Sequence, residues 1–169
     1  MNLITIDPGL GHTGIAFFIA EKFSHSFCIK RKGIDWIETL KFDFGEVFAV
    51  LDNHFLSAMN GVETQIWIES ARPYYTPQGR KALLSGSPIK LATLTGALFG
   101  ACVALTDLRS VNLITAPEWK GQLPDDVVKK RVAKYVPQLA SKILCKKMKI
   151  SIDEVCAIGI GKHILTGGL

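Results

Sequence analysis

The sequence predicts an α/β fold in which helices cover a mixed sheet. Two patterns support this prediction. Three short strand-like segments follow one another in the first thirty residues, and later apolar strand segments alternate with longer segments of helical periodicity. The 169 residues, of which 48% are hydrophobic, suit one compact domain spanning 1–169. No repeat or low-complexity linker divides them.

The first three strands are expected to be antiparallel neighbours. Residues 1–6 form an apolar segment that ends at the turn-forming run DPGLG, residues 7–11. Residues 13–20 (TGIAFFIA) then return as a hairpin partner. A third strand over residues 23–30 is indicated by rough alternation of apolar and polar side chains.

The remaining elements alternate between helix and strand. Apolar residues at helical spacing predict a helix over residues 45–60, and residues 64–68 form a strand that runs into Glu69. A long helix rich in small residues covers 88–105, and a short strand covers 112–115. The helix over 124–135 has acidic residues first and basic residues later, which complements its dipole. Ser151 is the expected N-cap of a last helix that runs to about residue 165.

Composition limits the class of protein. The hydrophobic content argues against disorder, and the net charge of +5 favours a polyanionic partner without naming one. An ordinary basic soluble protein fits the same charge. The apolar segment 91–105 is too short to span a membrane comfortably, so a buried helix is expected and no membrane partner.

The cysteines and the N-terminus indicate an intracellular protein. No charged region precedes an apolar run at the start, so no secretory signal is expected. The four cysteines are widely spaced, which argues against a zinc site and fits free thiols in a reducing compartment. We therefore expect a cytoplasmic, DNA-associated localisation, with a viral source among the options.

Three carboxylates are candidates for metal chemistry. Asp7 and Glu69 each follow an apolar strand, and Asp153 begins the last helix. If the two strands are neighbours, these side chains meet at one edge of the sheet, where α/β proteins place their sites. Clustered carboxylates repel each other unless a cation lies among them, and oxygen ligands select Mg²⁺ or Mn²⁺. Taken singly, each residue also fits an ordinary turn, strand end or helix cap.

Four segments resemble motifs of the RuvC-type Holliday junction resolvases. In chain order they are residues 4–16 (ITIDPGLGHTGIA), 66–70 (IWIES), 116–124 (APEWKGQLP) and 153–163 (DEVCAIGIGKH). The first resembles the strand, Asp-Pro-Gly and Thr-Gly motif, and the second a strand that ends in a catalytic Glu. The third is similar to the Trp-Lys-Gly segment of phage and bacterial members. The short chain and this segment favour a phage-type member.

The resemblance implies a function and a site. It implies a ribonuclease H-like fold with a mixed five-stranded sheet flanked by helices, a homodimer, and Mg²⁺-dependent paired nicks across a four-way junction. This is the activity of a crossover junction endodeoxyribonuclease in DNA recombination and repair. Two ions are expected, with Mn²⁺ able to substitute. Asp7, Glu69 and Asp153 match the family's catalytic and metal-binding positions.

The last motif departs from the family at Cys156. The family places a second acid there, and a thiol is a poor Mg²⁺ ligand. Glu154 is a candidate replacement, although on a regular helix it points about 100° away from Asp153. The metal site is therefore incomplete, weaker or built differently. Glu154 remains a candidate catalytic residue only if the start of the helix is distorted.

A basic and aromatic segment is the candidate DNA-contacting loop. Basic side chains can bind phosphates, and aromatic rings can stack on an unpaired base. The candidates in or near residues 70–81, together with one lysine of the Trp-Lys-Gly segment, are Arg72, Tyr74, Tyr75, Arg80, Lys81 and Lys120. A plain surface loop is the alternative.

Three functions stay open at this stage. The first is a nuclease that resolves Holliday or other branched junctions. The second is a non-catalytic junction-binding or structural protein of the same fold, favoured by Cys156. The third is a nuclease of the same fold that cuts flaps or replication forks. The three retained carboxylates favour a nuclease.

Overall fold

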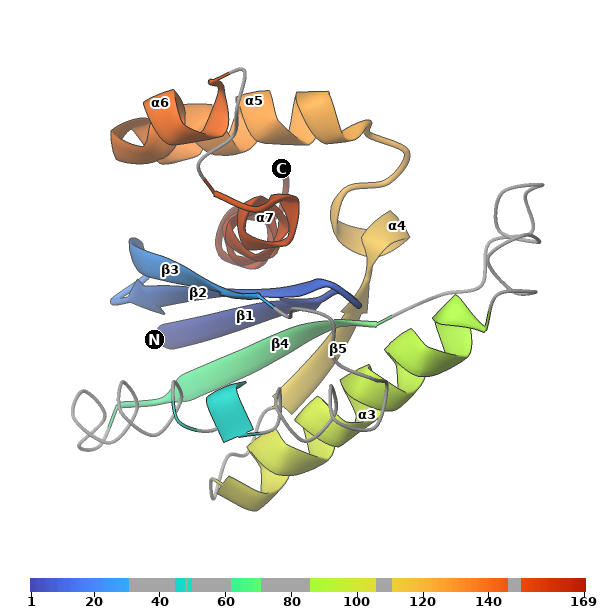
Figure 1. Ribbon diagram of the computed structural model, residues 1–169. Coiled ribbons are helices and arrows are strands. Elements are labelled where there is room, and N and C mark those ends of the chain that lie inside the picture. Colours follow the sequence, from blue (N-terminus) through green and yellow to red (C-terminus); the bar gives the residue numbers. More distant parts are fainter. Residues whose placement is uncertain (31–44, 48, 50–61, 71–85, 106–110, 146–149) are drawn as a thin grey trace.

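A mixed five-stranded sheet forms the centre of the protein (Figure 1). The computed structural model describes residues 1–30, 45–47, 49, 62–70, 86–105, 111–145 and 150–169. Its strands are β1 (Asn2–Pro8), β2 (His12–Ile19), β3 (Lys22–Lys30), β4 (Thr64–Ser70) and β5 (Val111–Thr115), in the spatial order β3-β2-β1-β4-β5. The first three are antiparallel, whereas β4 runs parallel to β1 and β5 runs parallel to β4. The predicted mixed five-stranded sheet is confirmed.

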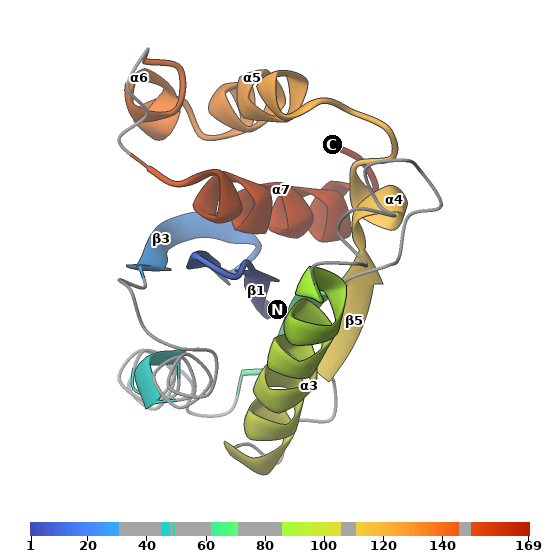
Figure 2. The same cartoon turned by 45° about the vertical axis from the view of Figure 1, so that its right-hand side comes forward.

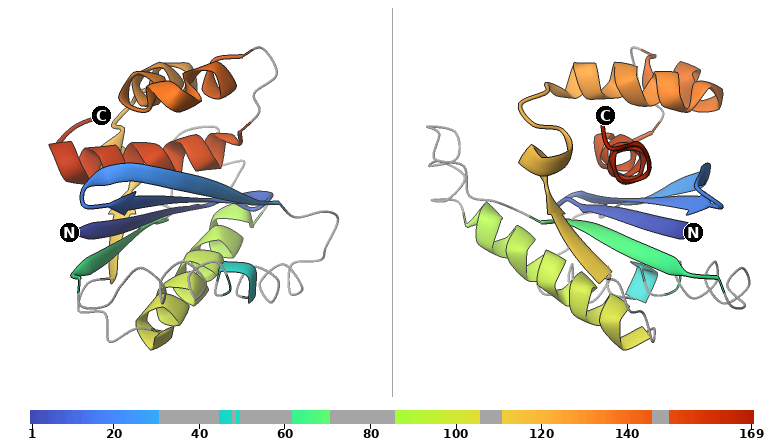
Figure 3. Two further views of the ribbon diagram at one scale, coloured as in Figure 1. Left: turned by 90° about the vertical axis from the view of Figure 1, so that its left-hand side faces the viewer. Right: turned by 180° about the vertical axis from the view of Figure 1, so that it is seen from behind.

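Helices cover both faces of this sheet. On one face lies α7 (Ile152–Thr166), with α5 (Asp125–Tyr135) and α6 (Ala140–Ile143) stacked beyond it (Figures 1 and 2). The opposite face is covered by α3 (Ser87–Leu105). Views from the side and from behind show the same arrangement (Figure 3). Two short elements complete this part of the chain: α4 (Ala116–Trp119) follows β5, and the 3₁₀ turn η1 (Pro137–Leu139) joins α5 to α6.

The apolar residues of β1 divide between two cores. Leu3 packs in the core under α7, whereas Ile4 and Ile6 pack in the core under α3. This division follows from the two-residue period of a strand. Residues 2–6 are all buried, including the polar Asn2 and Thr5, as expected for a central strand that is covered on both faces.

Small residues allow α7 to lie very close to the sheet. A Cβ at Gly14 would overlap the backbone carbonyl of Asp153, and one at Gly161 would overlap the ring of Phe18. The buried Thr5 hydroxyl donates to the Ala157 carbonyl at 2.6 Å, which joins β1 to the middle of α7. The central strand thus holds the last helix in a fixed position.

The element boundaries differ from the predicted ones in a few places. Asp7 and Glu69 lie within the last residues of β1 and β4 instead of after them. The helices α4 and α6 and the turn η1 were not predicted, because elements of three or four residues are too short to show a period. Of the predicted helix over 45–60, residues 45–47 and 49 are helical, and its other residues lie outside the described ranges.

The apolar helix α3 packs against the sheet through one side. Its residues Leu94, Leu98 and Cys102 belong to the core between the helix and the strands. By length and composition alone α3 is also able to cross a membrane, a test that core helices of soluble proteins pass as well. The sequence predicted a buried helix, and α3 is buried along this side only, with 28% of residues 87–104 buried.

Candidate metal and active site

The period of the strands places Asp7 and Glu69 on one face of the sheet. Ile6 of β1 pairs with Ile68 of β4 in parallel register, so Asp7 and Glu69 are the next residues along each strand. Both isoleucines pack under α3. Because side chains alternate along a strand, Asp7 and Glu69 face the opposite side, where α7 lies. Two neighbouring strands therefore present carboxylates to the same helix.

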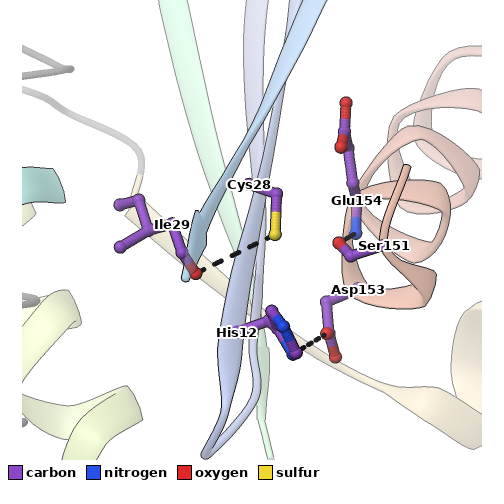
Figure 4. A network of polar contacts seen from close by, with 6 residues as sticks. All are labelled: His12, Cys28, Ile29, Ser151, Asp153 and Glu154. Carbon is purple, nitrogen blue, oxygen red and sulfur yellow. Dashed lines mark hydrogen bonds and ion pairs between the residues drawn. The ribbon is translucent and has the colours of Figure 1, made fainter. Parts of the chain in front are cut away.

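Asp153 reaches these carboxylates from the first turn of α7. Ser151 caps the helix, and its Oγ accepts a hydrogen bond from the Glu154 amide at 3.0 Å. The predicted cap is confirmed. A Cβ on Gly9 would lie 2.8 Å from Asp153 Oδ1, so only glycine leaves room for the carboxylate there. Asp153 Oδ2 lies 3.9 Å from His12 Nδ1, at the turn between β1 and β2 (Figure 4).

The short helix α4 brings a tryptophan and a lysine to the site. Its start is fixed by Glu118, whose Oε2 accepts hydrogen bonds from the Thr115 amide at 2.6 Å and from the Thr115 hydroxyl at 2.7 Å. Trp119, which is buried, donates from Nε1 to Glu69 Oε2 at 2.7 Å. The ammonium of Lys120 lies 5.1 Å from the Trp119 ring centroid and 3.9 Å from Cys156 Sγ.

These groups line one pocket of about 250 Å³. The side chains with chemistry in its wall are Asp7, Glu69, Lys120, Asp125, Asp153 and Cys156. They come from β1, β4, the segment 120–125 and α7, which are far apart in the sequence. One helical turn separates Asp153 from Cys156, which explains why both face the same pocket.

The carboxylates in the pocket repel one another. Burial raises the pKa of Asp7 well above its ordinary value, and the charges of Glu69 and Asp153 raise it further. Burial also raises the pKa of Glu69, although Lys120 and the hydrogen bond from Trp119 act in the opposite direction. A cation among these groups would remove the repulsion.

Cys156 and Lys120 differ in charge. Burial and the nearby Asp7 carboxylate raise the pKa of the Cys156 thiol far above its ordinary value, so the thiol is neutral at physiological pH. Burial opposes charge on Lys120, but neighbouring Cys156, Glu69 and Asp7 raise the lysine pKa above its ordinary value. Because the thiol is protonated, the attraction that raises the pKa of Lys120 comes from the carboxylates of Glu69 and Asp7. Lys120 therefore stays positively charged beside a neutral Cys156.

The donor set suits one hard cation better than two. Asp7, Glu69 and Asp153 supply the carboxylate oxygens that Mg²⁺ and Mn²⁺ prefer. Across the described ranges, however, no three His, Cys, Asp or Glu side chains already stand at the spacing of a shared ion. The carboxylates would have to draw together on binding. Beyond them the pocket wall continues with the exposed carboxylate of Asp125, the Cys156 thiol and the Lys120 ammonium, and the last two are unsuitable ligands for a second hard ion.

Glu154 lies away from this pocket. It is buried, and its Oε1 accepts a hydrogen bond from the Ser26 hydroxyl of β3 at 2.6 Å. Figure 4 shows its side chain extending away from the Asp153 carboxylate. The first turn of α7 is regular, so the distortion that would bring Glu154 to the pocket is absent from this helix.

The predicted DNA-contacting residues are only partly described. Lys120 lies in the pocket itself. The other five, Arg72, Tyr74, Tyr75, Arg80 and Lys81, lie outside the described residues.

Solved structures of known proteins share this fold. RuvC of Thermus thermophilus in complex with a Holliday junction substrate matches with a TM-score of 0.66 and 17% identity. A second Thermus thermophilus RuvC structure matches with a TM-score of 0.64 and 16% identity, and each match covers 99% of this chain and 95% of the other. This chain has a RuvC-like fold. No family model matches the sequence, and neither does any curated protein.

The RuvC-like fold confirms the ribonuclease H-like architecture that the sequence motifs implied. At these identities the likeness concerns the fold, and the chemistry has to be argued from the pocket. Sequence reasoning did not find the bond from Trp119 to Glu69 or the contact between Lys120 and Cys156. A signal for the first was present, because Thr115 and Glu118 have the spacing of a helix-capping box directly before Trp119.

Proposed function

We propose that this protein is a metal-dependent endonuclease that cuts four-way or other branched DNA. The observation that supports it most is the convergence of three carboxylates, from β1, β4 and α7, on one pocket of a RuvC-like fold. Each comes from a different part of the chain, and ordinary roles as turn, strand end and helix cap do not explain why all three meet.

Asp7, Glu69 and Asp153 would bind a divalent cation in this pocket. Bound Mg²⁺, or Mn²⁺ in its place, would activate a water molecule and stabilise the charge that develops on the phosphodiester. Trp119 holds the Glu69 carboxylate in one orientation by its hydrogen bond. Gly9 and Gly14 leave the space that Asp153 needs. These contacts hold Glu69 and Asp153 beside the pocket, and a bound cation would draw the carboxylates together.

The proposed substrate is DNA with a junction. One of the similar solved structures is a RuvC bound to a Holliday junction substrate. Lys120 would contact a phosphate near the site, because it is the cationic side chain in the pocket wall as far as the structure describes it. Arg72, Arg80 and Lys81, with Tyr74 and Tyr75, would extend this contact along the DNA.

We also propose that the protein acts as a homodimer, since paired nicks across one junction need two sites. The outward side of α3 is the surface we propose for the contact. Ile89 and Val103 are exposed there, and no described atom lies within 4 Å of a Cβ placed on Gly96 or Gly100. Small residues allow a second helix to approach closely.

A cleavage assay tests the proposed function. Wild-type protein should nick a four-way junction in Mg²⁺ or Mn²⁺, and flap, fork and linear duplex substrates in the same assay define the preferred structure. Asp7→Asn should lower cleavage by roughly 1,000-fold, because a metal ligand is lost, and leave junction affinity within about threefold, because the phosphate contacts are made by basic side chains that this substitution leaves in place. Asp126→Asn, at an exposed carboxylate of α5, is the matched control.

Two results would change the proposal. Cleavage by Asp7→Asn at the wild-type rate would show that the pocket is not the active site. If wild-type protein binds a junction tightly but cuts none of the substrates with either metal, the non-catalytic junction-binding function replaces the enzyme. Cys156 is the residue that favours this alternative.

A further inference from the structure

We propose that the ammonium of Lys120 takes the place of a second divalent cation, so that the pocket holds one divalent ion per chain. This inference rests on the proposed nuclease function and deepens it. It replaces the two ions expected from the sequence with one ion and one lysine.

The position of Lys120 is the first argument. Its Nζ lies 3.9 Å from Cys156 Sγ, in the wall of the pocket that Asp7, Glu69 and Asp153 also line. The lysine is held there by its neighbours, because Glu118 fixes the start of α4 and the Trp119 ring lies under the ammonium. The surrounding residues therefore hold the Lys120 ammonium at the pocket.

The lack of a hard ligand at position 156 is the next argument. The Cys156 side chain carries sulfur, a soft donor atom that is a poor ligand for Mg²⁺. Glu154 is the nearest other acid in the sequence, but its carboxylate is occupied by Ser26 on the far side of α7's first turn. Within the described residues, the remaining pocket acid is Asp125, which is exposed at the start of α5. It lies on α5, and its charge acts on both Glu69 and Lys120.

Lys120 would stabilise the reaction at the leaving group. Hydrolysis adds water across one P–O bond: the water oxygen bonds to phosphorus, and the bond from phosphorus to the leaving sugar oxygen breaks. One proton leaves the attacking water, and one proton is taken up by the leaving oxygen. An ammonium near that oxygen offsets its developing charge, as lysine does in other phosphoryl-transfer sites. It needs no additional reactant.

The test counts ions as well as measuring cleavage. Mn²⁺ is titrated into the protein by calorimetry, and Mn²⁺ is also counted by anomalous scattering in crystals of the protein with a bound four-way junction. The second method includes ions whose ligands come partly from phosphate. The variants are Lys120→Ala, the double variant with Lys120→Ala and Cys156→Asp, and Lys22→Ala as control. Lys22 is an exposed lysine at the opposite end of the sheet.

We expect one Mn²⁺ per chain in the wild type and in Lys22→Ala. Lys120→Ala should also bind one ion and cleave about 100-fold more slowly, the size of effect seen when one stabilising donor is removed from an active site. The double variant places a carboxylate at position 156 and removes the ammonium, so it should bind two ions and regain at least about tenfold in rate over Lys120→Ala.

Three results would overturn the inference while leaving the proposed function intact. The first is two bound Mn²⁺ ions in a wild-type protein that cleaves the junction. The second is cleavage by Lys120→Ala at the wild-type rate. The third is a double variant that binds one ion and cleaves no faster than Lys120→Ala. Absence of both Mn²⁺ binding and cleavage in wild-type protein would overturn the inference and the proposed function together.

Discussion

Glu69 depends on Trp119 for its orientation. The indole Nε1 donates to Oε2 at 2.7 Å, and this hydrogen bond lowers the pKa of a carboxyl that burial raises. A hydrogen bond to a charged group contributes about 1.5–3 kcal/mol, and its loss would release Glu69 to other rotamers. Trp119→Phe keeps an aromatic ring in the core and removes the donor together with part of the side-chain volume. We expect cleavage to slow about 10- to 100-fold with junction affinity unchanged.

Trp67→Phe is the matched control for this substitution. Trp67 lies on the same strand as Glu69 and also loses one indole hydrogen bond, to Gln65 Oε1 at 3.1 Å. Neither Trp67 nor its partner Gln65 lines the pocket, whereas Glu69, the partner of Trp119, does. Single-turnover cleavage and junction binding are measured for both variants. If both slow cleavage equally, the effect of Trp119→Phe comes from stability or packing and the orienting role is wrong.

Part of the site could be predicted residue by residue. Asp7, Glu69 and Asp153 stand at strand ends and a helix start, and local patterns in the sequence identify such positions. Trp119 and Lys120 could not be placed, because their roles depend on how α4 packs against α7 and β4. Glu154 shows a further limit. The sequence placed it beside Asp153, and only the structure shows its carboxylate against Ser26.

The contact between α7 and the β1–β2 hairpin requires glycine at position 14. A Cβ there would overlap the backbone of Asp153, which the strand and helix cannot both avoid without moving apart. Gly14→Ala should therefore lower the free energy of unfolding by about 2–3 kcal/mol, the usual cost of overpacking a core. It should also weaken metal binding, because Asp153 would move from the pocket. Chemical denaturation and Mn²⁺ titration measure the two effects.

Gly11→Ala tests whether position 14 is special. Gly11 lies in the turn between β1 and β2 and is exposed. No described atom lies within 4 Å of a Cβ added there. We expect a change of less than about 0.5 kcal/mol, as for other surface substitutions. Equal destabilisation by the two alanines would contradict the close-approach argument.

Whole elements were predicted best where the sequence repeats a pattern over many residues. The central strand β1 has mainly apolar residues over 1–6, and α7 has a Ser cap at one end and a glycine in left-handed conformation, Gly167, at the other. The four-residue helices α4 and α6 have too few residues for such a pattern. Their position is decided by tertiary contacts, such as those that bury Trp119 and Ile143.

At the scale of the whole molecule, the outward side of α3 is the proposed dimer contact. Gly96→Leu should disrupt a dimer by steric conflict with the second copy. It should not destabilise the single chain, because the described residues leave the position open and leucine favours a helix more than glycine does. Light scattering should show a shift from a dimer to the 18.5 kDa monomer, whereas Lys22→Leu should not cause one. A wild-type protein that stays monomeric with and without DNA would contradict the dimer.

The stability of the metal-free protein should depend on pH through the crowded carboxylates. The pKa of Asp7 is raised well above its ordinary value of 3.8, chiefly by burial and then by Glu69 and Asp153. Between the ordinary and the raised pKa the folded state binds more protons than the unfolded state. The contribution of Asp7 to stability therefore falls as pH rises through this window. Asparagine at position 7 resembles the protonated form and carries no charge at any pH.

This sign gives a prediction for Asp7→Asn in the absence of metal. With a chelator present, the variant should melt at about the same temperature as the wild type near pH 4. It should melt about 2–4 °C higher at pH 8, the shift that about 1 kcal/mol produces in a domain of this size. Adding Mg²⁺ or Mn²⁺ should reverse the order, because the ion stabilises the folded wild type in proportion to its affinity and the variant has lost a ligand. Calorimetric melting curves at both pH values test this. A variant that melts below the wild type at every pH, with metal and without it, would show that Asp7 stabilises the fold by its charge and that the pocket does not need a cation.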